Sequence, residues 1–226
     1  MSDVAETLAR YGVPPGARER LAQYASLLLE ANRRVNLTAA RDAEAIAAQI
    51  ADALPLVPLI EPRGELIDIG SGGGLPGIPL AILCGIRVTL VDATAKKTAF
   101  LQTALRELAL DGDAVTDRAE TLSHDARYRE HFANATARAL ASAPGAIELA
   151  LPFIVVGGRA LLQRGKMNDA ERDAARDAAL VLGGEVTEEL PAGGERRILV
   201  VTKRSATSSR FPRRVGVAQR RPLCSS

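Results

Sequence analysis

The 226-residue sequence has few of the residues that disulfide frameworks, metal sites and nucleophilic active sites need. Its two cysteines, Cys84 and Cys224, lie far apart without metal-ligand spacing, so we expect neither a disulfide framework nor a metal. The only histidines, His124 and His131, form no catalytic constellation and are interpreted as loop or surface residues. No apolar run reaches the ~18 residues of a membrane span, and charges throughout residues 1–20 argue against a signal peptide. These absences predict a soluble cytoplasmic protein.

What the sequence does contain is an uneven distribution of charge. Its apolar content of 47% and charged content of 25% are ordinary for a globular chain with one substantial core. Residues 196–226 hold nine Arg or Lys and no acid, whereas the rest holds 20 basic and 27 acidic side chains, a net charge of −7. A basic tail on an acidic body is typical of an arm that binds nucleic acid, and Phe211 offers a face for a base. The alternative is a solvated tail without a partner.

The most informative stretch joins a short apolar run to a cluster of glycines. Leu66–Ile69 predicts a strand, the glycines from Gly70 to Gly74 a tight turn, and Leu75–Leu83 the start of a helix. Glycines there let the backbone approach a ligand and leave N–H groups at a helix N-terminus free to bind it. A second strand, 88–91, ends in Asp92, whose carboxylate can accept hydrogen bonds from ribose hydroxyls. The stretch therefore indicates a nucleoside-cofactor site.

The glycine turn fits two cofactor classes. Gly72-x-Gly74-x-x-Gly77 matches the dinucleotide fingerprint of nicotinamide-dependent oxidoreductases. Asp68-x-Gly70-x-Gly72-x-Gly74 instead matches the turn of methyltransferases that use S-adenosylmethionine. A carboxylate at Asp68 attracts a cationic sulfonium cofactor and repels a pyrophosphate, which favours the second interpretation. A glycine-rich turn with no ligand is the remaining alternative.

From Glu65 onward apolar strands alternate with helices, which predicts a doubly wound, mostly parallel α/β sheet of seven strands. The expected strands span 65–69, 87–92, 113–117, 134–138, 157–163, 184–189 and 196–203. The expected helices span 17–35, 42–53, 75–84, 95–109, 142–153 and 167–182. We expect the last two strands to form an antiparallel hairpin at one edge. The chain then divides into a helical N-terminal cap (1–62), the sheet domain (63–204) and a basic tail (205–226).

Chemically distinctive residues follow the first four strands, at the rim where such sheets bind ligands. They are Gly70–Leu75, Asp92, Arg118–Glu120 and Arg138. Together with further motifs along nearly the whole chain, they make it resemble the bacterial small-subunit (16S) ribosomal RNA guanine-N7 methyltransferases, the RsmG or GidB family. The motifs that carry the resemblance are 32–39 (NRRVNLTA), 68–79 (DIGSGGGLPGIP), 118–120 (RAE), 136–139 (TARA), 195–203 (ERRILVVTK), 210–216 (RFPRRVG) and 221–223 (RPL).

The resemblance implies the class I S-adenosylmethionine-dependent methyltransferase fold and assigns roles to several residues. Ala119 and Glu120 would contact the adenine, and Arg138 would lie between cofactor and target base. Arg138 would then be the catalytic residue. The alternatives are that Glu120 is a surface charge and that Arg138 pairs with a carboxylate such as Asp68. The expected cofactor-binding residues are Gly70, Gly72, Leu75, Asp92, Ala119, Glu120 and Arg138.

The implied reaction is methyl transfer to guanine N7 in 16S ribosomal RNA or the small ribosomal subunit, by a monomer. Since N7 carries a lone pair and no proton, it can attack the sulfonium methyl without a general base. Many relatives have a Lys where this chain has Arg164, with Lys166 close by, which leaves open which cation meets the substrate. Deleting 205–226 is expected to weaken RNA binding with little effect on cofactor affinity. The competing functions are an NAD-dependent oxidoreductase and a non-enzymatic RNA-binding protein with a vestigial cofactor pocket.

Overall fold

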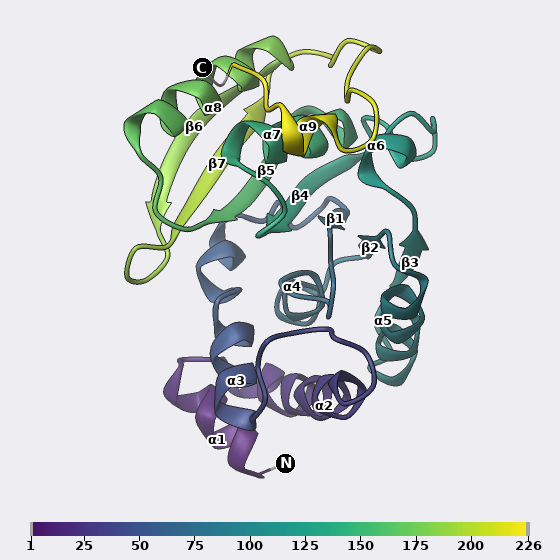
Figure 1. Cartoon of the computed structure of the whole chain (residues 1–226). Helices are drawn as coiled ribbons and strands as arrows, with labels where there is room; N and C mark the ends of the chain where they lie inside the picture. Colours follow the sequence, from purple (N-terminus) through teal and green to yellow (C-terminus); the bar gives the residue numbers. More distant parts are fainter. Residues whose placement is uncertain (1, 225–226) are drawn as a thin grey trace.

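The structure, a computed structural model, describes residues 2–224, so residue 1 of the expected cap and residues 225–226 of the expected tail lie outside it. Its centre is a seven-stranded sheet with the strand order β3-β2-β1-β4-β5-β7-β6 (Figure 1). Strands β1 to β5 run parallel, and β7 runs antiparallel to both β5 and β6. The predicted fold is confirmed. The strands are β1 Leu66–Ile69, β2 Val88–Asp92, β3 Gly112–Thr116, β4 Phe132–Arg138, β5 Ile154–Arg164, β6 Gly184–Pro191 and β7 Arg197–Lys203.

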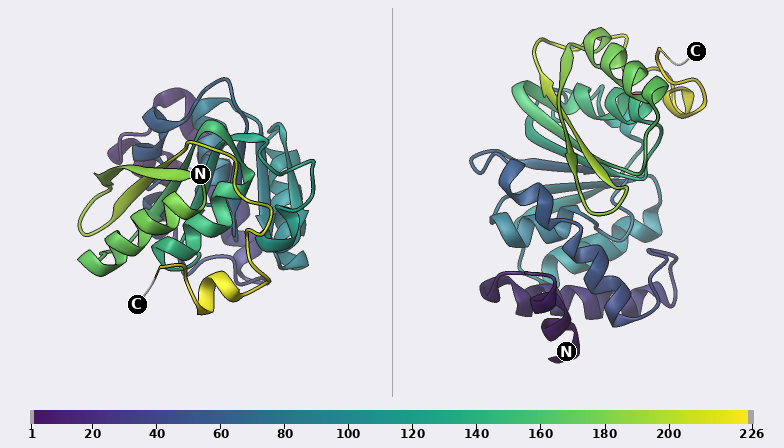
Figure 2. Two further views of the ribbon diagram at one scale, coloured as in Figure 1. Left: turned by 90° about the horizontal axis from the view of Figure 1, so that it is seen from above. Right: turned by 90° about the vertical axis from the view of Figure 1, so that its left-hand side faces the viewer.

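Helices cover both faces of the sheet (Figures 1 and 2). Helices α1 to α5 pack through one apolar core against the first face, and α6 to α9 pack through a second core against the other. All residues of β1 are buried because both of its faces are covered. The helices are α1 Ser2–Arg10, α2 Pro15–Asn32, α3 Ala43–Ala51, η1 Leu54–Leu59, α4 Gly77–Cys84, α5 Ala95–Glu107, α6 Ala119–Leu122, α7 Ala143–Ala150, η2 Leu151–Phe153, α8 Asp169–Val181 and α9 Val217–Arg220.

The expected strands and long helices all occur in their predicted places, with ends that differ by a few residues. The expected edge hairpin is β6–β7, with β6 outermost and β7 paired to β5. Helices α1, α6 and α9 were missed. Helices α6 and α9 have four residues each, and helices of this length are stabilised in water by tertiary packing, which no local sequence pattern reports.

The N-terminal helices pack directly against the glycine turn. Tyr24 of α2 is fully buried, and its hydroxyl donates a hydrogen bond of 2.7 Å to the carbonyl oxygen of Gly73. Burial raises the pKa of this phenol well above its usual range, so the hydroxyl keeps its proton as a donor. Leu28 and Leu37 lie so close to Gly73 that a Cβ there would stand 2.9 Å from Leu28 Cδ1. The N-terminal segment therefore stabilises the glycine turn through a hydrogen bond from Tyr24 and through apolar contacts of Leu28 and Leu37.

The described part of the basic tail, 205–224, lies along the body instead of extending from it (Figure 1). Phe211 is only 4% exposed, and the Arg210 guanidinium stands 4.8 Å from its ring centroid. The prediction that Phe211 offers a free face to a base is therefore wrong. Arg213 forms an ion pair of 2.6 Å with Glu148 of α7, which is fully buried, and α9 packs on the same helix. These contacts anchor the tail to the second face of the sheet.

Candidate functional site

The glycine turn between β1 and α4 depends on backbone conformations and close contacts that a side chain would disturb. Gly70 has a φ of +72°, in the left-handed region, and a Cβ there would lie 2.8 Å from Leu140 Cδ1. At Gly77, where α4 begins, a Cβ would lie 2.6 Å from Leu90 Cδ2. The N–H groups of Gly70 and Ser71 both donate to the carbonyl oxygen of Val91, which ties the turn to β2. The conformation of the turn therefore requires glycine at Gly70 and Gly77.

Asp68 contributes to the turn from inside the protein. Its carboxylate is 1% exposed and accepts hydrogen bonds from the Gly77 N–H at 3.2 Å and the Thr136 hydroxyl at 2.9 Å. Burial outweighs these bonds and raises the pKa of Asp68 to about 6. Arg138 does pair with a carboxylate, as one alternative expected, but this carboxylate is Asp52 at 4.0 Å and not Asp68. Asp68 therefore connects β1 and β4 to the start of α4.

Asp92 joins the end of β2 to the same turn. Its Oδ2 accepts a 3.0 Å hydrogen bond from the Gly72 N–H, and its Oδ1 accepts one of 2.9 Å from the Thr94 N–H. Lys97 Nζ lies 3.8 Å from Oδ2. Because each carboxylate oxygen accepts more than one hydrogen bond, Asp92 retains acceptor capacity toward a ligand. Its position at the rim is the one expected for binding a ribose.

A small cavity of about 110 Å³, here called the turn pocket, opens where β1 and β2 end. Its lining brings together Gly70, Asp92, Ala119 and Glu120 of the predicted site, with Leu140 and Gln219 among the other lining residues. Gly72 lies beside it through its bond to Asp92, whereas Leu75 is 4% exposed in the core beneath the turn. Four predicted residues from three separate segments thus meet in one cavity.

Glu120 is not the surface charge that one alternative proposed. It is 7% exposed, and its Oε1 accepts a 2.7 Å hydrogen bond from the Gly216 N–H of the tail. Gln219, on the tail helix α9, lines the turn pocket directly. Sequence reasoning missed this contribution because Gln219 belongs to no chemical motif and only the course of the tail brings it here. The tail is part of the turn pocket, which argues against the expectation that its deletion would spare the cofactor site.

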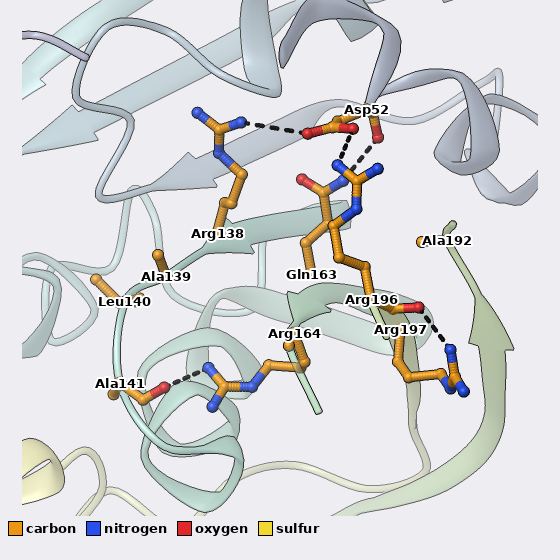
Figure 3. Close-up of a pocket in the computed structure, with 11 residues that line it drawn as sticks. Asp52, Arg138, Ala139, Leu140, Ala141, Gln163, Arg164, Ala192, Arg196 and Arg197 are labelled. Carbon is orange, nitrogen blue, oxygen red and sulfur yellow. Dashed lines mark hydrogen bonds and ion pairs between the residues drawn. The ribbon is translucent and has the colours of Figure 1, made fainter. Parts of the chain in front are cut away.

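Arg138 lines a different and larger cavity of about 420 Å³, here called the arginine pocket (Figure 3). Arg164, Arg196 and Arg197 also line it. Asp52 lies among them, forming an ion pair with Arg196 and standing 4.0 Å from Arg138. These side chains come from the ends of β4, β5 and β7 and from the residue after α3. The pocket concentrates positive charge around one carboxylate.

The turn pocket and the arginine pocket are neighbours. Leu140, two residues after β4 ends, lines both of them and also touches the position of a Gly70 Cβ. Of the two cations that the sequence left open, Arg164 lines the arginine pocket, whereas Lys166 is exposed and pairs with Glu195 on the surface. The structure therefore brings Arg164, and not Lys166, to the candidate site. A ligand in one pocket can meet a ligand in the other across Leu140.

Comparison with known protein families shows which family the chain belongs to. Residues 17–200 match the family model described as rRNA small subunit methyltransferase G, the GidB family. The chain belongs to this family. A ribosomal RNA small subunit methyltransferase G of Rubrobacter xylanophilus is 39% identical over 224 residues, which cover 92% of this chain and 85% of that protein. The glycine turn is therefore that of a methyltransferase and not of a nicotinamide-dependent oxidoreductase.

Solved structures of methyltransferases share the fold of this GidB-family chain. A ribosomal protein L11 methylase from Lactobacillus delbrueckii subsp. bulgaricus aligns with a TM-score of 0.55 at 13% identity, over 70% of this chain and 80% of that one. CalO1, a methyltransferase of calicheamicin biosynthesis in an SAH-bound form, aligns with a TM-score of 0.53 at 12% identity, over 71% of this chain and 56% of that one. At such identities the likeness establishes the fold alone.

Three further features of the GidB-family chain bear on the expectations from sequence. Within residues 2–224, no helix is both long and apolar enough to cross a membrane. In the same described part of the chain, no group of three or more His, Cys, Asp or Glu side chains is arranged to hold a metal ion. His124, one of the two histidines, places Nε2 3.2 Å from the Pro212 carbonyl oxygen, so its described contact is with the tail.

Proposed function

We propose that the protein transfers a methyl group from S-adenosylmethionine to N7 of a guanine in 16S ribosomal RNA. The observation that carries this proposal is the adjacency of the turn pocket and the arginine pocket across Leu140. The residues that line the first suit a nucleoside cofactor, and those that line the second suit a base with its phosphates. Both open at the carboxyl ends of parallel strands, where open α/β sheets bind their ligands. Family membership favours the same activity.

The residues of the turn pocket suit S-adenosylmethionine. Gly70 leaves open a space that a Cβ would fill, and Asp92 places a carboxylate at the rim for the ribose hydroxyls. Ala119 and Glu120 line the far side of the same cavity, where we place the adenine, and Gly72 fixes the Asp92 carboxylate. Leu75 supports the turn from the core. The cofactor supplies an electrophilic methyl group on a sulfonium.

The arginine pocket suits a guanine and its phosphates. Arg138, the proposed catalytic residue, lies two residues before Leu140, which lines both pockets, and its guanidinium can donate to guanine O6 or a phosphate. Guanine N7 needs no deprotonation before it attacks the methyl carbon, so the protein needs no general base. Catalysis then rests on holding N7 and the methyl carbon in line. The two histidines have no role in this scheme.

The RNA would reach the site as an unstacked base, since a paired and stacked guanine cannot enter a pocket of this kind. Phosphate contacts would come from the arginine pocket and from exposed arginines of the tail. Arg210, Arg214, Arg220 and Arg221 are exposed in the described structure. That the protein acts as a monomer, in the cytoplasm and without a metal stays a prediction.

The test is to map methylation on 16S ribosomal RNA from cells with and without this protein. We expect one guanine to lose its N7 methyl group when the protein is absent. The purified protein and labelled S-adenosylmethionine should restore it, on naked RNA or on small subunits. If RNA binds but no label is transferred to either substrate, the protein is a non-enzymatic RNA-binding protein with a vestigial pocket. Separate calorimetric titrations with S-adenosylmethionine and NADH identify the cofactor independently.

A further inference from the structure

We propose that Asp52 recognises the target guanine through its Watson–Crick edge and thereby makes the arginine pocket specific for guanine. This inference rests on the proposed function. Among the residues that the structure describes, Asp52 is the one acidic residue in the lining of the pocket, amid four arginines. A pocket of arginines alone would bind phosphates and the carbonyl of guanine, uracil or cytosine, and so would not separate these three bases. The carboxylate is the group that can add selectivity.

The position of Asp52 is fixed by contacts from three elements. Its backbone caps the C-terminus of α3, where its N–H donates to the Ala48 and Ile50 carbonyl oxygens. Its own carbonyl oxygen accepts a 2.7 Å hydrogen bond from Gln163 Nε2 at the end of β5. Arg196 holds its Oδ1. The carboxylate therefore enters the pocket in a set orientation, as Figure 3 shows, although it comes from outside the sheet.

The second carboxylate oxygen of Asp52 is open to a ligand. In the described part of the chain, the partner of Oδ2 is Arg138 Nη1 at 4.0 Å, which is beyond hydrogen-bond distance. The Asp52 side chain is 22% exposed and lines the arginine pocket, so its carboxylate can be reached by a ligand there. Beside it, the Gln163 side-chain oxygen is buried and lacks a hydrogen-bond partner among the described residues. Acceptors without partners favour a ligand that brings donors.

Guanine is the base that brings donors in the matching pattern. Its N1–H and N2 amino group are adjacent donors on one edge, and a carboxylate accepts both with its two oxygens. Its O6 is an acceptor next to N1, which suits the arginines, while N7 stays free to attack the methyl carbon. Adenine instead presents the N1 lone pair toward a carboxylate, which is repulsive. The combination of Asp52 with Arg138 therefore selects guanine and rejects adenine.

The test measures methyl transfer to reconstituted small subunits whose 16S RNA carries guanosine or inosine at the mapped position. Inosine keeps N1–H, O6 and N7 but lacks the N2 amino group. We expect the wild-type protein to prefer guanosine by about tenfold or more in kcat/KM, the value of a charge-assisted hydrogen bond. Asp52→Asn should lower kcat/KM on guanosine at least as much and bring the ratio of the two substrates near one. Asp52→Glu, which keeps the charge but moves it, should also lower the ratio.

Two control variants separate recognition from support. Arg196→Gln removes the partner of Oδ1 but leaves the carboxylate, so it should slow both substrates and preserve the guanosine preference. Asp173→Asn breaks an exposed ion pair with Arg176 on α8 and should change neither. If Asp52→Asn slows guanosine and inosine equally, Asp52 only orients the arginines and the inference is overturned while the proposed function stands. If the wild-type protein methylates no guanine at all, the proposed function itself fails.

Discussion

The turn pocket and the arginine pocket are built in opposite ways. The turn pocket is organised around the glycine turn, where the N–H of Gly72, two residues after Gly70, donates a hydrogen bond to Asp92. The arginine pocket is made of side chains from four segments, which lie near residues 52, 138–141, 163–165 and 192–197. The difference suits their proposed ligands. A cofactor common to many enzymes can be bound by a recurrent backbone turn, whereas a particular base in RNA is recognised by charged side chains at specific positions.

The largest expected effect concerns the tail, which contributes Gln219 to the lining of the turn pocket. Arg213→Ala leaves Glu148 buried without its charged partner, which should destabilise the protein by about 3 kcal/mol. Because the same tail segment carries Gly216 and Gln219, affinity for S-adenosylmethionine should fall as well. Urea unfolding and calorimetric titration measure the two effects. Unchanged cofactor affinity would mean that the turn pocket is complete without the tail.

The next effect separates the two pockets. Arg138→Ala should lower the rate of methyl transfer about a hundredfold, as the loss of an aligned electrostatic contact does in other enzymes. Affinity for S-adenosylmethionine should stay within about twofold, since Arg138 lines the arginine pocket and not the turn pocket. Single-turnover kinetics and calorimetry provide the two numbers. Lys166→Ala, which removes a surface ion pair outside both pockets, is the matched control.

A smaller effect tests the charge inside the turn. The pKa of Asp68 rises from 3.8 in the unfolded chain to about 6 in the folded protein. Between these values the folded state holds a proton that the unfolded chain has lost, so the free energy of unfolding falls as pH rises through this window. Asp68→Asn should remove this loss, on the order of 2 kcal/mol. Denaturant titrations at pH 4 and pH 7 give the free energy of unfolding of the wild type and of Asp68→Asn. If this free energy changed equally with pH in both proteins, the pKa of Asp68 would not be raised by folding.

The smallest effect should be confined to the turn pocket. Gly70→Ala introduces a Cβ at a φ of +72° and 2.8 Å from Leu140 Cδ1. A left-handed alanine costs about 1 kcal/mol, and if the turn moves to relieve this strain, affinity for S-adenosylmethionine should fall roughly fivefold. RNA affinity without cofactor, measured by fluorescence anisotropy, should not change. Gly165→Ala, at a position with open space around it beside the arginine pocket, should leave cofactor affinity as it is.

The features that sequence reasoning predicted well are local ones. The strand, glycine turn and helix from Leu66 to Cys84 follow from neighbouring residues, and so does the placement of Asp92. The buried pairing of Arg213 with Glu148 joins residues 65 positions apart, and no local pattern announces it. The same holds for Phe211, which reads as an exposed aromatic among arginines but packs into the second core. Contacts between residues that are far apart in the sequence are set by tertiary packing, which no local pattern predicts.

Sequence alone determined the alternation of strands and helices, the glycine turn and the acidic residues at the rim. These follow from hydrophobic periodicity and from backbone conformation, which each segment carries in its own residues. Tertiary structure alone decided that the tail completes the turn pocket through Gln219 and that Asp52 enters the arginine pocket. The physical reason is that a charged side chain has no periodicity of its own. Its partner is set by where distant segments are placed when the apolar cores close.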